Sequence, residues 1–451
     1  MSRLFGTDGI RGVANRDLTP ELAMRIGRAA ASLLPRAPQK PIAIGRDTRV
    51  SGTMLESALV AGLTSAGYDV VSLGIVPTPA VACVTRAADC AAGIVISASH
   101  NPIDDNGIKF FGSDGFKLSD ELESRIEGLL DSADLPRPIG TDVGTARAAQ
   151  NLARFYYHEL YEGAIELTGL PVVVDGGFGA AYAIAPYALR KLGAHVSEIN
   201  CEPDGARINV ACGATDLVGL QAAVRARVEA GERRTVGVAF DGDADRVLFV
   251  DETGAVVTGD HVLFALGRAM HERGELARDA IVATHMSNVG FERALRKHGI
   301  GLVRAAVGDR YVLEEMQAGG YNLGGEQSGH VIDFRYNTTG DGPRTAVTLL
   351  GLLISTGTTL HELVREVVYA PQILLNVRTS RREVLELPAV RDAIAAAESE
   401  LAESGRLFVR ASGTEPLIRV MAEGDDAATV ERVAARVAGR IEQEAARFAS
   451  T

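Results

Sequence analysis

Residues 235–246 read TVGVAFDGDADR, an apolar run that ends abruptly in alternating aspartates. A short apolar run that stops at polar residues is typical of a buried strand that opens into a loop. The pattern recurs in PIAIGRD (41–47), DVVSLGIV (69–76), GIVISAS (93–99) and LPVVVD (170–175). Helical stretches lie between such strands, at 119–130, 216–230 and 260–272. This alternation predicts sheets covered by helices, the α/β class.

The chain is too long for one core, because it has 451 residues and domains usually hold about 100–150. After residue 370 the pattern changes to strand, helix, two strands and a second helix. We therefore expect three α/β domains with mixed sheets covered by helices, and one smaller C-terminal α+β domain. The expected domains span 1–150, 151–252, 253–369 and 370–451. Residues 131–148 hold Pro, Gly and Asp without periodicity, which predicts a connector.

The net charge of −12 argues against nonspecific binding to nucleic acid or to an anionic membrane, since both need basic patches. A few local arginines and lysines can still attract a phosphorylated substrate into one cleft. The four cysteines form no CxxC pair, so neither a zinc site nor a disulfide scaffold is expected. The N-terminus lacks an apolar signal segment, and no run reaches the roughly 20 apolar residues of a membrane span. A cytoplasmic protein is therefore expected.

The loop at 241–246 carries Asp241, Asp243 and Asp245. An extended loop with this spacing aims three carboxylates at one point, where they repel unless a hard cation binds, and oxygen-only ligands suit Mg²⁺. Arg246 adds positive charge beside that site. An EF-hand calcium loop is rejected, because Arg246 stands where glycine is required and the flanks are strand-like. A solvated acidic turn, and a phosphatase of the haloacid-dehalogenase kind with an aspartate nucleophile, stay open.

The segment ISASHNP (96–102) delivers Ser99 from the end of a buried strand, a favourable place for a ligand crevice. A turn or helix cap is the alternative for such a Ser-His-Asn sequence. A hydrolase triad lacks its GxSxG elbow here. Neighbouring strand residues point to opposite sides, so His100 is expected to be a poor base for Ser99. Ser99 is therefore a candidate phosphate carrier, with the aspartates supplying a cation.

RASGTEP (410–416) also follows a strand, and its composition is typical of an anion site. Small residues let backbone N–H groups face a phosphate, hydroxyls add donors, and arginine binds bidentately. An ordinary turn with a surface arginine is the alternative. The candidate residues are Arg410, Ser412, Gly413 and Thr414, with Arg419 nearby.

GGEQSGH (324–330) supplies a fourth set of candidates. Glu326 and Ser328 suit sugar hydroxyls, and His330 titrates near neutrality, as a proton-transfer group should. A plain glycine-rich loop is the alternative reading of this segment alone.

Taken together and in this order, the four motifs resemble those of the α-D-phosphohexomutase superfamily over nearly the whole chain. Further segments resemble the branch of that superfamily that acts on glucosamine phosphates: FGTDGIRG (5–12), SASHNP (97–102) with DNGIKFF (105–111), VGDRYVLEEM (307–316) and NTTGDG (337–342). Some relatives carry a histidine where Asp309 stands, so no role in proton transfer is transferred to that residue.

The resemblance implies four domains around a central cleft and assigns roles to the candidates. Ser99 would be the phosphorylated serine, and phosphorylation would be required for activity. Asp241, Asp243 and Asp245 would bind one Mg²⁺, with a phosphoserine oxygen on Ser99 as a further ligand. Residues around the transferring group, among which the general acid and base are sought, would be Arg11, Lys109, Arg246 and His330. Sugar hydroxyls would be bound by Glu326 and Ser328, and the non-reacting phosphate by Arg410, Ser412, Gly413, Thr414 and Arg419.

The reaction implied by the resemblance converts glucosamine 6-phosphate to glucosamine 1-phosphate and back through a 1,6-bisphosphate. It would supply the synthesis of UDP-N-acetylglucosamine and of cell-wall precursors. The partner would be a small-molecule sugar phosphate, without nucleic acid or membrane, and the family implies a homodimer. The alternatives are a mutase of mannose or glucose phosphates and, more remotely, a metal-dependent sugar phosphatase.

Overall fold

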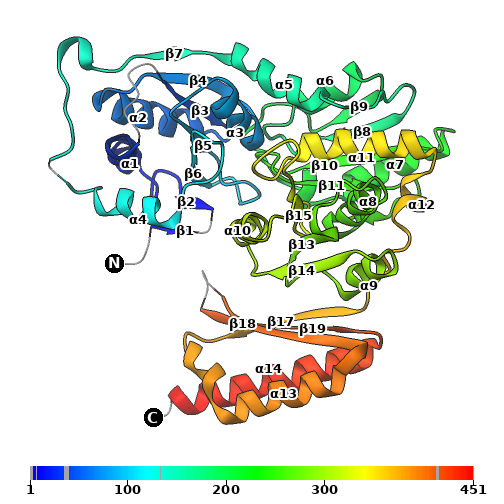
Figure 1. The fold of residues 1–451 in the computed structure, drawn as a ribbon. Coiled ribbons are helices and arrows are strands. Elements are labelled where there is room, and N and C mark those ends of the chain that lie inside the picture. The colour runs from blue at the N-terminus through cyan, green and yellow to red at the C-terminus, as the bar shows by residue number, and fades with distance from the viewer. Residues whose placement is uncertain (1–3, 7, 35–39, 133, 413–415, 450–451) are drawn as a thin grey trace. The chain divides into compact units, whose positions relative to one another are not determined.

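The computed structural model describes residues 4–6, 8–34, 40–132, 134–412 and 416–449. Packing divides the chain into two compact units (Figure 1). The large unit contains Met1–Thr284 and Val303–Arg365, and the small unit contains His285–Leu302 and Glu366–Thr451. This division does not separate the first three expected domains, so the bounds of the four expected domains stay a prediction.

The first sheet of the large unit has seven strands in the order β1-β2-β6-β5-β3-β4-β7. Strands β3, β4, β5 and β7 pair in parallel, whereas β1, β2 and β6 join antiparallel, so the sheet is mixed as expected. The strands are β1 (Phe5–Gly6), β2 (Gly9–Val13), β3 (Ile42–Arg46), β4 (Val70–Ile75), β5 (Ala92–Ile96), β6 (Asp105–Gly112) and β7 (Ala146–Ala148). The helices of this part are α1 (Pro20–Leu33), α2 (Gly52–Ser65), α3 (Thr78–Ala87) and α4 (Asp120–Gly128).

Helices cover both faces of this sheet because alternate residues of its strands point to opposite sides. Ile42 and Ile44 join the cluster with α1 and α2, while Ala43 between them joins the cluster with α3. The expected connector at 131–148 is wrong at its end, because Ala146–Ala148 pairs with β4 as an edge strand. Its three residues are exposed, so no apolar alternation marks them as a strand.

The second sheet has the order β12-β11-β10-β8-β9, and the acidic loop at 241–246 joins its strands β10 and β11. Its strands are β8 (Pro171–Asp175), β9 (His195–Ile199), β10 (Val236–Phe240), β11 (Val247–Val250) and β12 (Val256–Val257). The neighbouring helices are α5 (Arg154–Tyr161), α6 (Ile184–Lys191) and α7 (Val218–Glu229). Every residue of β10 is buried, which explains its uninterrupted apolar sequence.

The third sheet has the order β14-β13-β15-β16. Its strands are β13 (Ala280–Thr284), β14 (Gly301–Ala305), β15 (Leu323–Gly325) and β16 (Val331–Asp333). The helices of this segment are α8 (Gly259–Glu272), α9 (Val289–Lys297), α10 (Asp309–Gly319), α11 (Gly342–Thr356) and α12 (Leu360–Val364). Helix α9 falls in the small unit by its packing.

The rest of the small unit is an antiparallel sheet, β17-β19-β18, with helices α13 and α14 on one face (Figure 1). The strands are β17 (Gln372–Arg378), β18 (Gly405–Ala411) and β19 (Leu417–Gly424), and the helices are α13 (Pro388–Leu401) and α14 (Ala427–Ala449). This is the expected α+β arrangement. With the three helix-covered mixed sheets, it confirms the predicted fold class.

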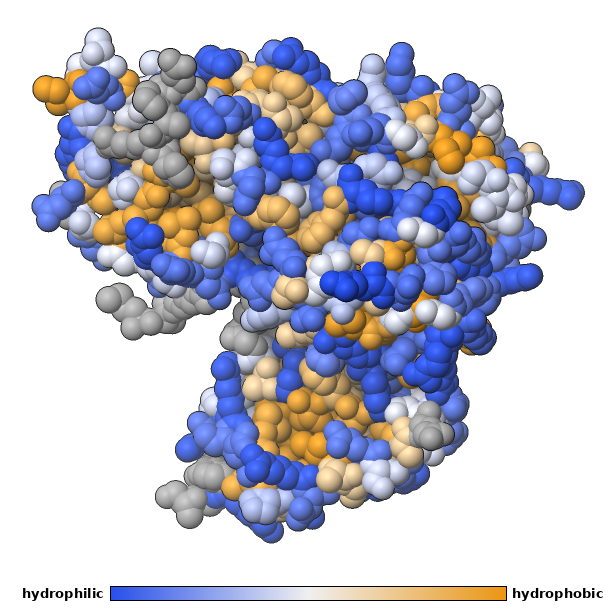
Figure 2. Space-filling model, in the orientation of Figure 1, coloured by the Kyte–Doolittle hydropathy of each residue, from blue (hydrophilic) through white to orange (hydrophobic). Residues whose placement is uncertain are grey.

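No helix in the described part of the chain is both long and apolar enough to cross a bilayer. Figure 2 shows hydrophilic residues over much of the visible surface of each unit, with apolar residues in separate patches.

A buried polar junction joins α5 to α3 and α11. Glu159 Oε2 accepts a hydrogen bond from Arg86 at 3.1 Å, while its Oε1 is buried without a hydrogen-bond partner. Burial, and then the neighbouring carboxyl of Asp341, raise the pKa of Glu159 to about 7. The folded state therefore holds this proton more tightly than the unfolded chain does.

The Glu159→Gln variant should show the effect of this group as pH-dependent stability. Below the pKa that Glu159 has in the unfolded chain, both the folded and the unfolded state carry the proton, so Glu159 does not lower the free energy of unfolding. As the pH rises toward 7 the unfolded chain ionises first, and the folded state loses stability. Glutamine cannot ionise, so the variant escapes this loss. The free energy of unfolding of the variant minus that of wild type should therefore increase by about 2–3 kcal/mol from pH 5 to pH 8. Urea unfolding followed by circular dichroism measures the free energy of unfolding of wild type and variant at each pH. A difference between the two proteins that is the same at pH 5 and at pH 8 would contradict the prediction.

Candidate active site

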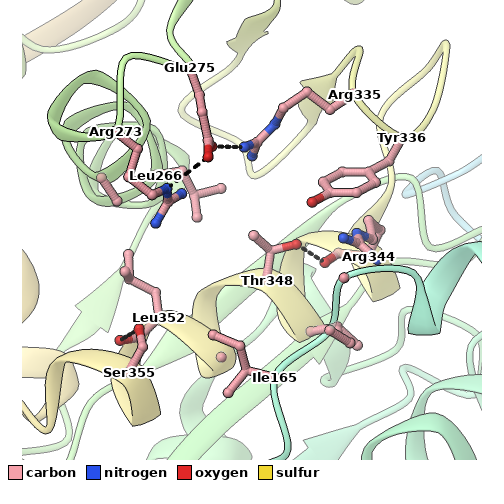
Figure 3. Close-up of a pocket in the computed structure, with 15 residues that line it drawn as sticks. Ile165, Leu266, Arg273, Glu275, Arg335, Tyr336, Arg344, Thr348, Leu352 and Ser355 are labelled. Carbon is pink, nitrogen blue, oxygen red and sulfur yellow. Dashed lines mark hydrogen bonds and ion pairs between the residues drawn. The ribbon is translucent and has the colours of Figure 1, made fainter.

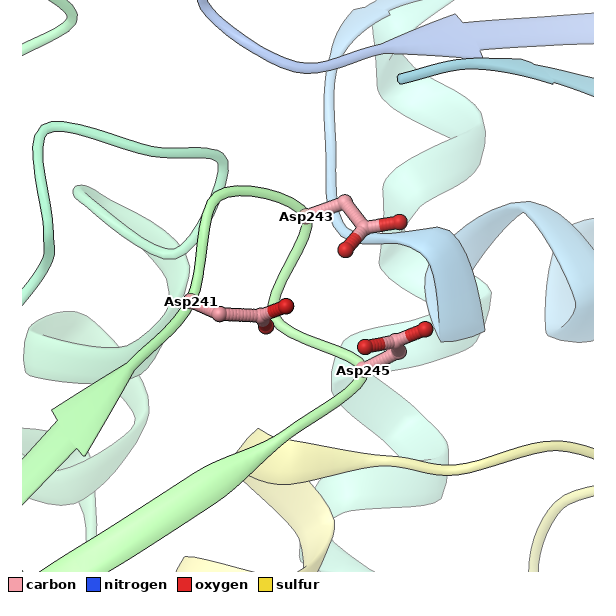
Figure 4. Close-up of side chains that lie close together, drawn as sticks. All are labelled: Asp241, Asp243 and Asp245. Atoms are coloured by element: carbon pink, nitrogen blue, oxygen red, sulfur yellow. The ribbon is translucent and has the colours of Figure 1, made fainter. Parts of the chain in front are cut away.

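The acidic loop gathers its three aspartates immediately after β10. Carboxylate oxygens of Asp241, Asp243 and Asp245 lie within 4.8 Å of one another, and all three residues are buried. Figure 4 shows the three side chains turned toward a common space from one loop. Ala244 takes a left-handed backbone conformation with φ +56°, which folds the loop tightly. The predicted convergence of these carboxylates is thus present in the structure.

The charges around this cluster fit a bound divalent cation. Burial, followed by repulsion from Asp245 and Asp243, raises the pKa of Asp241 well above its usual range. Oδ1 of Asp243 and Oδ1 of Asp245 are buried and accept no hydrogen bond. Two free carboxylate oxygens and one carboxyl that resists ionisation are the situation a hard cation relieves. The residues therefore suit the predicted Mg²⁺ site.

Ser99 reaches this cluster from the first sheet. Strand β5 ends at Ile96, and the loop after it places Ser99, 1% exposed, beside the acidic loop. Ser99 Oγ donates a hydrogen bond to Asp241 Oδ2 at 2.6 Å. Two motifs separated by 142 positions therefore meet at one hydroxyl.

His100 differs from the expectation that it points away from Ser99. Its Nδ1 lies 3.3 Å from Ser99 Oγ. The expectation assumed extended backbone, whereas Ser99 has φ +51°, which turns the two side chains to the same side. Although His100 has an exposed edge, partial desolvation of the ring, followed by the charges of Arg246 and Arg11, lowers its pKa to about 4. The imidazole is therefore neutral at neutral pH.

Three predicted cationic residues surround the acidic loop. Lys109 Nζ lies 2.9 Å from Asp243 and 3.7 Å from Asp245. Burial alone would raise the pKa of Asp245, but Lys109 and the nearby His330 hold it below its usual range. Arg246 donates its backbone N–H to Asp241 Oδ1 at 3.2 Å. Arg11 is bonded to Asn101, in the serine loop, at 3.2 Å.

The sugar-loop candidates lie in the same unit and adjoin this group. An antiparallel bridge pairs His330 with Arg246, and His330 Nδ1 lies 3.6 Å from Asp245 Oδ2. Burial opposes protonation of His330, but Asp245 outweighs it and raises the pKa. Ser328 Oγ donates to Glu326 Oε2 at 3.1 Å. The large unit therefore brings together every predicted residue between Arg11 and His330.

The phosphate-loop candidates belong to the small unit. Arg410 on β18 lies directly opposite Arg419 on β19, away from the strand residues that pack on the helices. Burial, and then Arg419, lower the pKa of Arg410, because two like charges face each other across the strands. Ser412 donates its backbone N–H to Leu417 at 2.8 Å. Gly413 and Thr414 lie outside the described residues.

The structure adds residues that the motifs did not single out. Asp8 Oδ2 lies 2.9 Å from Lys109 Nζ, and Asp8 also pairs with Arg11. Lys117 bridges Asp8, at 2.6 Å, and Asp309. Asp8 sits inside FGTDGIRG and could have been chosen there as an acidic partner of Arg11. Lys117 carried no signal in the sequence, because strand pairing places it.

A cavity of about 370 Å³ lies elsewhere in the large unit (Figure 3). Leu266, Tyr336, Arg344 and Leu352 line it, and none of the predicted site residues does. Two of the arginines that line it, Arg335 and Arg273, pair with Glu275, and Arg335 also pairs with Asp333. The cavity is therefore separate from the acidic cluster.

Comparisons with known proteins agree with this arrangement. The phosphoglucomutase/phosphomannomutase alpha/beta/alpha domains I, II and III match residues 2–137, 154–254 and 258–370, and the C-terminal domain of that family matches 374–440. The chain is 51% identical over 450 residues to the phosphoglucosamine mutase of Symbiobacterium thermophilum, covering 98% of this chain and 100% of the relative. The phosphoglucosamine mutase of Pelotomaculum thermopropionicum is 49% identical over 448 residues, with the same coverage.

Solved structures show the same fold at lower identity. A phosphoglucomutase/phosphomannomutase family protein from Burkholderia thailandensis has a TM-score of 0.83 at 24% identity and covers 98% of each chain. The N-acetylphosphoglucosamine mutase of Aspergillus fumigatus, solved with GlcNAc-6P and magnesium, has a TM-score of 0.66 at 18% identity, over 98% of this chain and 96% of that one. With four matching domains in order and full-length relatives near 50% identity, the chain belongs to the phosphoglucosamine mutase family of the phosphohexomutase superfamily.

Proposed function

We propose that this chain interconverts glucosamine 6-phosphate and glucosamine 1-phosphate, with Ser99 as its phosphoryl carrier. The observation that carries the proposal is the 2.6 Å hydrogen bond from Ser99 Oγ to Asp241. It places a buried hydroxyl against a buried carboxylate cluster with unsatisfied oxygens. The relatives named phosphoglucosamine mutase support the choice of an amino sugar. The product would feed the synthesis of UDP-N-acetylglucosamine and of cell-wall precursors.

The reaction begins with a phosphoryl group on Ser99. The bond from phosphorus to Ser99 Oγ breaks as a bond forms to the free hydroxyl of the sugar monophosphate, and the hydroxyl proton passes to a base in the site. A 1,6-bisphosphate results, and the released Ser99 Oγ takes up a proton. After the bisphosphate turns in the site, its other phosphoryl group returns to Ser99 Oγ, the proton of that hydroxyl passes through the site to the sugar oxygen whose bond to phosphorus breaks, and the isomeric monophosphate leaves. Atoms and charge balance over the cycle, with no oxidant or water consumed.

The chain's own residues supply charge and position for this transfer. Asp241, Asp243 and Asp245 would hold Mg²⁺, which when bound neutralises charge on the phosphoryl oxygens. Lys109 and Arg246 place positive charge beside the same oxygens, which lowers the barrier to phosphoryl transfer by electrostatic stabilisation.

The remaining polar residues would bind the substrate. Glu326 and Ser328 would accept and donate hydrogen bonds to sugar hydroxyls. Arg410 and Arg419, with Ser412, would bind the phosphate that is not reacting, because an anion relieves the repulsion between the two guanidinium groups. Gly413 and Thr414 are proposed for the same role on the resemblance alone.

The function is tested by ³¹P NMR of the purified protein with Mg²⁺, a trace of glucosamine 1,6-bisphosphate and glucosamine 6-phosphate. Appearance of glucosamine 1-phosphate supports the proposal. Steady release of inorganic phosphate would favour a phosphatase. Turnover of glucose or mannose phosphates, without turnover of the glucosamine phosphate, would keep the mutase and discard the amino-sugar substrate.

The Arg410→Ala variant should raise KM for glucosamine 6-phosphate by about 10- to 100-fold, since a charge-assisted phosphate contact contributes about 1.5–3 kcal/mol. The change in kcat should be smaller, because the non-reacting phosphate is bound alike before and during transfer. Arg436→Ala is the matched control: this arginine lies on α14 and pairs with Glu400 at 2.7 Å. An unchanged KM in Arg410→Ala would refute the proposed phosphate site.

A further inference from the structure

The backbone of the carrier serine is held in a conformation that serine rarely adopts. Ser99 has φ +51°, in the left-handed region, which costs a non-glycine residue about 1–2 kcal/mol. Such a conformation persists only where the surroundings hold it. Side chains bind both backbone polar groups of Ser99, and one buried ion pair takes part in both contacts.

That ion pair is formed by Asp47 and Arg49, in the loop after β3. Their side chains are fully buried, and Arg49 Nε donates to Asp47 Oδ2 at 3.0 Å. Strands β3 and β5 are parallel neighbours, so their carboxyl ends bring this loop and the serine loop together. The backbone N–H of Asp47 donates to the carbonyl of Ile96 at 3.1 Å, which continues the pairing beyond the strands.

Arg49 binds four backbone carbonyls of the serine loop with its two terminal nitrogens. One nitrogen donates to Ser99 at 2.9 Å and to Asn101 at 2.8 Å. The other donates to Asp105 at 2.9 Å and to Pro102. A planar guanidinium with a fixed fork of donors can satisfy these carbonyls together, whereas an ammonium cannot reach all of them.

Asp47 controls the other side of Ser99. Ser97 Oγ donates to Asp47 Oδ2 at 2.6 Å and accepts the backbone N–H of Ser99 at 2.9 Å. The carbonyl of Ser99 is held by Arg49, and its N–H is held through Ser97 by Asp47. The Asp47–Arg49 pair therefore takes part in holding the peptide groups on both sides of the serine, and Asn209 Nδ2 adds a second donor to the Ser99 carbonyl at 2.8 Å. Together these contacts fix where Oγ points.

We propose that Arg49, oriented by Asp47, is a positioning residue for phosphoryl transfer: it holds Ser99 in the left-handed conformation that aims Oγ at the acidic cluster. The inference rests on Ser99 being the carrier, as proposed above. Arg49 touches neither the acidic cluster nor the sugar-loop residues among its recorded contacts, so its effect passes through the loop backbone.

The test compares Arg49→Lys, Ser97→Ala and the control Arg46→Lys. Arg46 ends β3, is partly buried, bonds Glu56 at 2.9 Å and reaches the backbone carbonyl of Asp47 at 3.4 Å, but none of its recorded side-chain bonds goes to the serine loop or to the Asp47 carboxylate. Arg49→Lys should lower kcat by about 100-fold, the cost of a displacement near 1 Å in a reacting group, while KM changes by less than about threefold. Ser97→Ala should lower kcat by about tenfold in the same way. Arg46→Lys should keep the kcat of wild type.

A second readout separates positioning from general loss of structure. The ³¹P resonance of phosphorylated Ser99 should shift or broaden in Arg49→Lys and Ser97→Ala, while circular dichroism stays that of wild type. If Arg49→Lys does not fold, Ser97→Ala decides. A folded Ser97→Ala with the kcat and ³¹P resonance of wild type overturns the inference, and so does a folded Arg49→Lys with both unchanged. If wild type is never phosphorylated on Ser99, the proposed carrier fails and this inference fails with it. If wild type is phosphorylated but the variants behave like wild type, only the inference about Arg49 fails.

Discussion

Ser99→Ala should abolish mutase turnover, with kcat lowered by about 10⁴-fold or more, the range seen when a covalent nucleophile is removed. The reason is that the phosphoryl group has no other oxygen to occupy in the same place. Ser99 Oγ lies 2.6 Å from Asp241 Oδ2. Ser99 and the aspartates of the cluster are buried, so a hydroxyl on the protein surface cannot take its place. Turnover followed by ³¹P NMR, and the intact mass of the protein after incubation with the bisphosphate, measure the effect. The variant should gain no phosphoryl group.

The fold should tolerate this substitution. Alanine adopts the φ of Ser99 no less easily than serine does, and the side chain is smaller. The variant loses the hydrogen bond to Asp241 Oδ2, which costs about 1–3 kcal/mol when the acceptor stays buried, and the longer contact with His100 Nδ1. Circular dichroism should therefore match wild type, so that lost turnover reports chemistry.

Thr78→Val is the control, because Thr78 offers the other side-chain hydroxyl that is recorded against the acidic cluster. Thr78 Oγ1 donates to Asp243 Oδ2 at 2.6 Å. The valine variant should still become phosphorylated and retain turnover, since its hydroxyl only orients a carboxylate. If Thr78→Val loses phosphorylation while Ser99→Ala keeps it, the carrier has been misassigned.

Local patterns predicted the strands that carry the site. The apolar runs of β3, β4, β5 and β10 end within a few residues of where the sequence indicates, because a strand buried on both faces leaves an unbroken apolar signature. The polar residues that follow those strands form the acidic and serine loops. The spacing of Asp241, Asp243 and Asp245 predicted their convergence but left a solvated acidic turn open, and the tight loop also depends on the left-handed φ of Ala244.

Long-range pairing explains what the sequence could not predict. Lys117 reaches Asp8 because the strands near them, β2 and β6, pair antiparallel, and no local pattern records that pairing. Strand β7 is three exposed residues that are ordered by β4. The orientation of His100 depends on a left-handed φ at Ser99, which serine gives no reason to expect.

Asp241→Asn should have two opposite effects, because Asp241 is both a proposed cation ligand and the carboxyl of the cluster that resists ionisation. Activity with Mg²⁺ should fall by about 10³-fold, as when one charge-stabilising group is removed from an active site. The unfolding temperature without divalent cations should rise at pH 8. Burial and two neighbouring carboxylates raise the pKa of Asp241, so its ionisation destabilises the folded state as the pH increases. Asparagine removes that cost.

The geometry of Asp241 makes asparagine a close replacement. Oδ1 accepts the backbone N–H of Arg246, and the asparagine can keep this bond. In wild type Asp241 Oδ2 accepts a hydrogen bond from Ser99 Oγ; in the variant the amide nitrogen stands in the place of Oδ2 and can donate a hydrogen bond to Ser99 Oγ instead. Thermal unfolding with EDTA and with saturating MgCl₂ separates the effects: Mg²⁺ should stabilise wild type and leave Asp241→Asn unchanged. Asp251→Asn is the control, since this buried aspartate caps its own turn, bonding Thr253, away from the cluster. Equal stabilisation of wild type and Asp241→Asn by Mg²⁺ would show that the cation binds elsewhere.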